Sequence, residues 1–136
     1  MITAVDTSVL LDVFLPDPRF VGLSSTALQR AAVAGSLMIC EIVYAELAAQ
    51  FSRREQLDAV LEKLEIQLEP VGREAAFAAG RAFRRYRDSG GPKTRMISDF
   101  LIGAHAENQA SCLLSRDRGF YRSYFKKLSL IDPAGD

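Results

Sequence analysis

Residues 1–15 read MITAVDTSVLLDVFL, and this stretch decides which fold the chain can adopt. The apolar residues from Ile2 to Val5 predict a short buried strand, and the segment from Ser8 to Phe14 predicts a helix that ends before Pro16. Asp6 therefore stands where a strand gives way to a helix. Ligands of open parallel sheets bind beyond the carboxyl ends of the strands, so a functional carboxylate suits this position. An aspartate there can also serve only to cap the helix.

Short apolar runs alternate with helical segments along the rest of the chain. Further strands are predicted at residues 37–40, 66–71, 111–115 and 128–131. Helices are predicted at residues 20–34, 42–51, 53–65, 73–88, 98–108 and 120–125, with Gly35 closing the first of them and Ser98 capping the fifth. This alternation indicates an α/β fold, in which a parallel sheet is covered by helices on both faces.

The composition fits one ordinary globular domain that spans residues 1–136. The 17 basic and 17 acidic residues cancel, so any attraction to nucleic acid must come from local patches. The longest stretches without a charged residue have about ten residues, far fewer than a bilayer span of about 20, and the N-terminus lacks a basic leader. These features predict a cytoplasmic protein that does not bind membranes.

Acidic residues gather at the predicted carboxyl ends of the strands. They are Asp6, Glu41 with Glu46 five residues further on, Asp117 just beyond the strand 111–115, and Asp99 in the first turn of the helix 98–108. Each one alone could be a helix cap, a turn former or a solvated residue. Crowded at one edge of a parallel sheet, they would repel one another unless a cation neutralised them. Oxygen ligands without nearby His or Cys favour Mg²⁺ or Mn²⁺.

Four segments, in this order and at these spacings, resemble the PIN-domain ribonucleases, and above all the VapC-type toxins of toxin–antitoxin systems. They are VDTSVLLD (5–12), EIVYAEL (41–47), SDFLIGAHA (98–106) and LLSRDRGFY (113–121). The resemblance runs from residue 2 to about residue 133. It implies a PIN-like fold with a five-stranded parallel sheet in the order 3-2-1-4-5. It also implies a Mg²⁺- or Mn²⁺-dependent endoribonuclease that leaves a 5′-phosphate and a 3′-hydroxyl, a cognate antitoxin as partner, and a homodimer.

The resemblance also implies roles for individual residues. The catalytic and metal-binding set would be Asp6, Glu46, Asp99 and Asp117. Ser8 matches a small polar residue of the family, and Ser115 matches a hydroxyl residue two positions before the last acid. Glu41 either adds an outer contact to the site or only caps its helix. Asp12 is expected to be structural, since it lies more than one turn into the first helix.

A basic segment precedes Asp99. From Arg81 to Arg95 the chain carries six positive charges against the single acid Asp88. These residues could hold the phosphate backbone of RNA, or they could form a solvated basic face. The residues expected to bind RNA are Arg84, Arg85, Lys93, Arg95 and Arg116, of which Arg116 could instead balance the acids.

Other readings of the same residues have less support. An aspartyl-phosphate phosphatase would need an acid where Ser8 stands, and a receiver domain would need a late lysine and a phosphoacceptor on a middle strand. A PIN-fold nuclease of RNA processing and a non-catalytic PIN-fold binding module remain alternatives.

His105 is expected to be a packed helix residue, and the aromatic residues of the segment 120–125 are expected to lie in the core. With one strand between them in the implied order, Cys40 and Cys112 are about 9.5 Å apart, too far for a disulfide.

Overall fold

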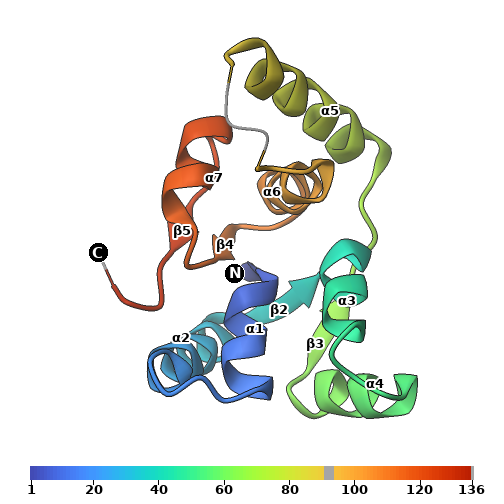
Figure 1. Ribbon diagram of the computed structural model, residues 1–136. Coiled ribbons are helices and arrows are strands. Elements are labelled where there is room, and N and C mark those ends of the chain that lie inside the picture. The colour runs from blue at the N-terminus through green and yellow to red at the C-terminus, as the bar shows by residue number, and fades with distance from the viewer. Residues whose placement is uncertain (91–93, 136) are drawn as a thin grey trace.

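The structure is a computed structural model that describes residues 1–90 and 94–135. Its strands are β1 (Ile2–Val5), β2 (Ser36–Ile39), β3 (Ile66–Leu68), β4 (Cys112–Leu114) and β5 (Leu130–Ile131). Its helices are α1 (Thr7–Phe14), α2 (Val21–Ala34), α3 (Glu41–Ala48), α4 (Arg54–Lys63), α5 (Arg73–Asp88), α6 (Ile97–Gln109) and α7 (Arg118–Tyr124). Strands and helices alternate as the hydrophobic pattern predicts (Figure 1).

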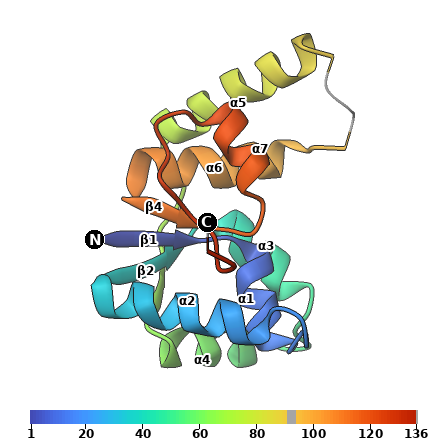
Figure 2. The ribbon, with the colours of Figure 1, turned by 90° about the vertical axis from the view of Figure 1, so that its left-hand side faces the viewer.

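The five strands form one parallel sheet in the order β3-β2-β1-β4-β5, which confirms the predicted order. The central strand β1 lies between β2 and β4, and its residues 3–5 are buried because helices cover both faces of the sheet. Figure 2 shows α1, α2 and α4 on one side of the sheet and α5 and α6 on the other. The backbone N–H of Asp6 donates to the carbonyl of Leu114 at 2.9 Å, so the pairing of β1 with β4 continues to the acid itself.

Two details differ from the sequence-based expectations. Ser98 does not cap α6, which begins one residue earlier with Met96 as its cap; the carboxylate of Asp99 accepts a hydrogen bond from the Met96 N–H at 3.1 Å and closes this end of the helix. Gly35 follows α2 as predicted, but its backbone is extended. A Cβ at Gly35 would lie 1.8 Å from the carbonyl oxygen of Met1, so close approach of the backbone requires glycine here.

The long helix α5 is attached to the rest of the molecule mainly through α6. Aromatic rings fill this junction, with Phe100 of α6 at the centre and the rings of Phe83, Tyr86, Phe120 and Tyr124 between 5.1 and 5.6 Å from it, centroid to centroid. The segment 120–125 therefore belongs to the core, as expected. Edge-to-face contacts of this kind stabilise by about 0.5–1.5 kcal/mol each beyond the area that they bury.

The expectations about the two thiols and the histidine are also met. Cys40 and Cys112 are buried and free. Within residues 1–90 and 94–135, no helix is long and apolar enough to cross a lipid bilayer. His105 is buried, with 1% of its surface exposed, and its Nε2 has no hydrogen-bond partner among the described residues. Burial lowers the pKa of His105, against a hydrogen bond to the Glu69 backbone and the charges of Glu41 and Glu69, which raise it.

The close contact between α6 and Phe125, the residue that follows α7, predicts an effect of adding one methyl group. A Cβ at Gly103 would lie 2.4 Å from the ring of Phe125, which is itself buried, whereas a Cβ at Gly80 of α5 would meet nothing within 4 Å. Gly103→Ala should lower the free energy of unfolding by about 1–3 kcal/mol through overpacking. Gly80→Ala, the matched control, should raise it by about 0.4–1 kcal/mol. Urea denaturation measures both, and equal stabilisation by the two variants would refute the packing.

The buried histidine predicts a pH dependence of stability. The unfolded chain takes up a proton near pH 6.5, but the folded chain does so only at lower pH. The free energy of unfolding should therefore fall as the pH drops below about 6.5, by up to about 1.4 kcal/mol per pH unit. His105 is the sole histidine of the chain, so His105→Gln should remove this slope. Denaturation curves between pH 5.5 and 7.5 test it, and parallel curves for the two proteins would contradict it.

Candidate active site

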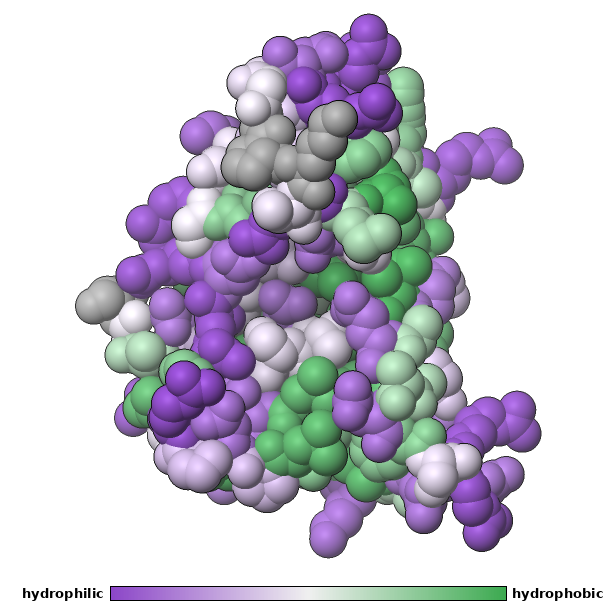
Figure 3. Space-filling model, viewed as in Figure 1, coloured by the Kyte–Doolittle hydropathy of each residue, from purple (hydrophilic) through white to green (hydrophobic). Residues whose placement is uncertain are grey.

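A cleft of about 500 Å³ opens at the carboxyl ends of the central strands. It is lined by the four predicted acids Asp6, Glu46, Asp99 and Asp117, together with Thr7, Ser8, Leu11, Ile102, Arg116 and Tyr121. In Figure 3 the centre of this face is hollowed and is bordered by hydrophilic residues. The structure therefore brings together four acids that lie up to 111 residues apart in the sequence.

Four different elements supply these acids. Asp6 follows β1 and is the N-cap of α1, Asp117 follows β4 and precedes α7, Asp99 lies in the first turn of α6, and Glu46 is on α3. The first turns of α1 and α6 thus border the cleft. The positive ends of their helix dipoles favour negative charge and offset part of the repulsion among the carboxylates.

Asp6 is the most buried of the acids, with 8% of its surface exposed. Its Oδ1 accepts a hydrogen bond from the Thr7 N–H at 2.8 Å. Its Oδ2 accepts one from the Ser115 hydroxyl at 2.7 Å and another from the Tyr121 hydroxyl at 3.2 Å. The Ser115 Oγ also accepts the N–H of Asp117 at 2.9 Å, so one hydroxyl links two of the acids.

Burial raises the pKa of Asp6, while its hydrogen bonds with Ser115, Thr7 and Tyr121 lower it; the negative charge of Glu46 adds a smaller rise. Burial also raises the pKa of Tyr121 well above 10, so this phenol remains a donor to the carboxylate. Sequence reasoning assigned Tyr121 to packing alone. The position of its hydroxyl could not be read from the pattern, because the contact joins residues 115 positions apart.

Glu46 and Asp99 each hold a nearby donor. The Thr7 hydroxyl donates to Oε1 of Glu46 at 2.5 Å, so Thr7 binds Asp6 through its backbone and Glu46 through its side chain. Asp99 accepts the Met96 N–H, as described above. No sequence pattern indicates that Thr7 joins two acids, because Glu46 lies 39 positions away from it.

Asp117 is paired with a cation of the chain itself. Its Oδ2 lies 2.5 Å from Nη1 of Arg95, and the Arg95 guanidinium also stacks on Phe120, 4.2 Å from the ring centroid. The hydrogen bond to Asp117 raises the pKa of Arg95, with a smaller contribution from the charge of Asp99. Arg95, expected to bind RNA, thus contacts the acidic set directly.

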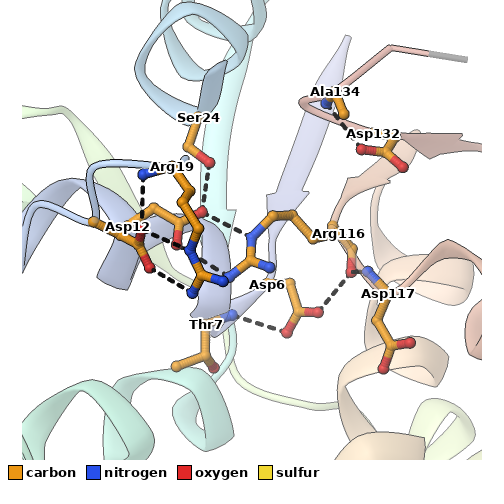
Figure 4. A network of polar contacts seen from close by, with 11 residues as sticks. Asp6, Thr7, Asp12, Arg19, Ser24, Arg116, Asp117, Asp132 and Ala134 are labelled. Atoms are coloured by element: carbon orange, nitrogen blue, oxygen red, sulfur yellow. Dashed lines mark hydrogen bonds and ion pairs between the residues drawn. The ribbon is translucent and has the colours of Figure 1, made fainter. Parts of the chain in front are cut away.

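Arg116 also meets an acid, but a different one. Its Nε and Nη2 lie 2.9 and 3.1 Å from the two carboxylate oxygens of Asp12, which also accepts the Ser24 hydroxyl at 2.7 Å. The guanidinium stacks on Phe20 at 3.9 Å. Figure 4 shows Arg116 extending toward Asp12 while Asp117 points the other way. Asp12, which is 4% exposed, is structural as expected, and it is the acid that Arg116 balances.

The other predicted residues fall inside and outside the cleft. Ser8 lines it and Ser115 binds Asp6. Glu41 lies in the first turn of α3 and accepts the Val71 N–H at 3.0 Å, which connects it to the segment after β3. Two expected RNA-binding residues are exposed on α5: Arg84 pairs with Asp88 at 3.1 Å, and Arg85 Nη2 lies 3.5 Å from the Tyr124 carbonyl. The predicted Lys93 lies outside the described residues.

The donor set of the cleft is suited to a hard divalent cation. The four acids and the hydroxyls of Thr7 and Ser8 offer oxygen atoms, and the cleft is lined by neither His nor Cys. Within the described part of the chain, no three acidic, His or Cys side chains lie close enough to hold one ion as they stand. Each of the four acids instead has a donor from the chain: Thr7 and Ser115 for Asp6, Thr7 for Glu46, Met96 for Asp99 and Arg95 for Asp117.

Solved structures show which fold this is. The chain is similar to VapBC2 from Rickettsia felis bound to a DNA fragment from its promoter, at 22% identity and a TM-score of 0.75 over 97% of this chain and 98% of that one. It is also similar to VapBC-1 from nontypeable Haemophilus influenzae, at 18% identity and a TM-score of 0.73 over 98% and 99% of the two chains. FitAcB from Neisseria gonorrhoeae matches at 20% identity and a TM-score of 0.69 over 98% and 99%.

No curated protein sequence gives a significant match to the chain. The sequence profile of the PIN domain does match, over residues 3–126. These residues include β2, β3 and β4, all of β1 except its first residue, and the four acids of the cleft. The chain belongs to the PIN domain family.

Proposed function

We propose that this protein is a divalent-metal-dependent endoribonuclease and the toxin of a type II toxin–antitoxin module. One observation carries the proposal. Asp6, Glu46, Asp99 and Asp117 come from four separate elements of a PIN domain and line one cleft at the carboxyl edge of the sheet. Repulsion among these carboxylates is unfavourable, and a bound Mg²⁺ or Mn²⁺ ion would relieve it by neutralising their charge.

These four acids would hold the cation, which when bound supplies an activated water and stabilises charge on a phosphodiester group. The chain contributes rigidity: Thr7, Ser115 and Tyr121 fix the Asp6 carboxylate through three hydrogen bonds from separate elements. The first turns of α1 and α6 border the cleft, and the positive ends of their helix dipoles would favour a phosphate there. His105 takes no part, because it is buried in α6.

The basic segment from Arg81 to Arg95 supports RNA as the substrate. It places positive charges on the exposed side of α5 and carries Arg95 to the rim of the acidic cleft. Phosphate contacts of this kind position a nucleic acid without reading its sequence. Arg116 is held by Asp12 and has the weaker case as an RNA contact.

The toxin role is supported by the likeness to solved structures, one of which is a toxin–antitoxin complex from Klebsiella pneumoniae. By analogy, a short protein encoded beside this one would bind as antitoxin and present an Arg or Lys to the acids of the cleft. A homodimer, implied by the same resemblance, and a cytoplasmic location, predicted from the sequence features above, are part of the proposal. Light scattering of the purified protein tests the first of these.

The nuclease proposal predicts the effect of removing one carboxylate charge. Asp99→Asn keeps the shape of the side chain but should reduce RNA cleavage by more than about 100-fold, because even outer-shell partners of metal ligands are worth about 10- to 100-fold. Asp58→Asn is the matched control: Asp58 lies on α4, outside the cleft, and accepts a hydrogen bond from Tyr44. Cleavage of labelled single-stranded RNA by folded protein is the measurement. Wild-type activity in Asp99→Asn, or full activity in excess EDTA, would refute the metal mechanism.

The toxin proposal predicts an effect on growth. Induced expression of the wild-type chain in bacteria should arrest growth, whereas Asp99→Asn at equal protein level should not. Co-expression of the protein encoded by the adjacent short reading frame should restore growth. Sequencing of RNA 5′ ends after induction would identify the cleaved RNA. Normal growth during expression of the wild-type chain would refute the toxin role. The nuclease activity is tested separately by the cleavage assay.

A further inference from the structure

Arg95 connects two regions of opposite charge. Its backbone N–H donates to the hydroxyl of Tyr86, a buried residue near the end of the basic helix α5, at 3.3 Å. Its side chain reaches Asp117, whose Oδ2 lies 2.5 Å from Nη1. The main chain of Arg95 is therefore attached to the basic side, while its guanidinium neutralises one acid of the cleft.

The guanidinium is positioned for this contact from two directions. The Phe120 ring lies 4.2 Å from its central carbon, and Phe120 follows Asp117 by three residues at the start of α7. Stacking on an aromatic face and an ion pair to a carboxylate are both interactions that suit the planar guanidinium better than an ammonium. The pair is nevertheless partly open to solvent, with 31% of the Arg95 side chain and 41% of the Asp117 side chain exposed. A pair of this exposure can exchange partners.

Arg116 has no such freedom. It makes two hydrogen bonds to Asp12, whose side chain is only 4% exposed. A cation that binds Asp117 therefore competes with Arg95 and leaves Arg116 in place. A guanidinium and a divalent cation repel each other at one carboxylate, so each weakens the binding of the other.

We propose that Arg95 is an internal counter-ion of the cleft, that a divalent cation displaces it from Asp117, and that the released guanidinium then binds a phosphate of the RNA. The inference rests on the proposed nuclease function. It assigns Arg95 two successive partners, a carboxylate and a phosphate, and it couples the loading of the cleft to substrate binding. Coupling between two ligands at neighbouring sites commonly amounts to about 5- to 150-fold in affinity.

The full chain and its variants test this by titration with Mn²⁺ alone, followed by the electron paramagnetic resonance signal of the free ion. Arg95→Met and Arg95→Gln both remove the charge, and each should bind Mn²⁺ about five- to tenfold more tightly than the wild type. Arg53→Met is the matched control. Arg53 pairs with Glu55 at 3.6 Å on the exposed surface at the start of α4, and its loss should leave the Mn²⁺ affinity within about twofold.

Steady-state cleavage of single-stranded RNA gives a second readout. Arg95→Met should reach half-maximal activity at a lower Mn²⁺ concentration while its KM for RNA rises. Damage to the fold would weaken the binding of both Mn²⁺ and RNA. Tighter Mn²⁺ binding together with weaker RNA binding therefore distinguishes an exchanging counter-ion from a structural residue. Circular dichroism checks that each variant is folded.

The outcomes separate this inference from the function on which it rests. Wild-type protein that binds Mn²⁺ and cleaves RNA, combined with unchanged or weaker Mn²⁺ binding in both Arg95 variants, would overturn the counter-ion alone. An unchanged KM for RNA in Arg95→Met would overturn the phosphate contact. Wild-type protein that binds no Mn²⁺ and cleaves no RNA would overturn the proposed function and this inference together.

Discussion

The carboxylate of Asp6 can remain buried only while it keeps its hydrogen-bond donors, because an unpaired charge removed from water costs several kcal/mol. Those donors are the Thr7 N–H, the Ser115 hydroxyl and the Tyr121 hydroxyl. They belong to α1, to the end of β4 and to α7. One charge therefore constrains three elements around the central strand β1. The parallel pairing of β1 with β4 is what brings Ser115 within reach of it.

The charges around the cleft are divided into separate pairs. Arg116 belongs to Asp12 on α1, and Arg95 belongs to Asp117. Among the described residues, Glu46 accepts a hydrogen bond from the neutral hydroxyl of Thr7 and Asp99 accepts one from a backbone N–H, and neither forms an ion pair. Neighbouring residues in the sequence, Arg116 and Asp117, are thus committed to different partners, and the cleft keeps more negative than positive charge. That imbalance is what makes the cleft attractive to a small, hard cation.

Much of the fold could be predicted because its signals are local. The strand at residues 2–5, the helix at residues 73–88 and the packed His105 follow from runs and spacings of apolar residues, and the order of the strands followed from resemblance to a family. Positions of the acids at strand ends could be predicted for the same reason. The start of α6 at Ile97 could not be predicted, because the hydrogen bond from the Met96 N–H to Asp99 outweighs the preference for serine as a cap.

The partners of individual side chains lie beyond such reasoning. The hydroxyl of Tyr121 meets an acid 115 positions away, and Arg116 meets one 104 positions away. Composition shows that arginines and acids are available, but the choice between a phosphate and a carboxylate partner depends on distances that only the folded chain defines. Sequence patterns place a residue on an element, and tertiary packing decides what its polar atoms touch.

The packing of Phe100 in the aromatic junction limits which substitutions α5 can accept during evolution. It follows Asp99 directly and packs against Phe83 and Tyr86 of α5, which otherwise has few contacts with the sheet. The helix that would contact RNA and the proposed catalytic residue Asp99 therefore both depend on the packing of Phe100. A mutation in α5 that changes the choice of RNA is tolerated only if Phe100 keeps its packing against Phe83 and Tyr86. Diversification of specificity in this chain should proceed through exposed α5 side chains, while the rings beneath them stay fixed.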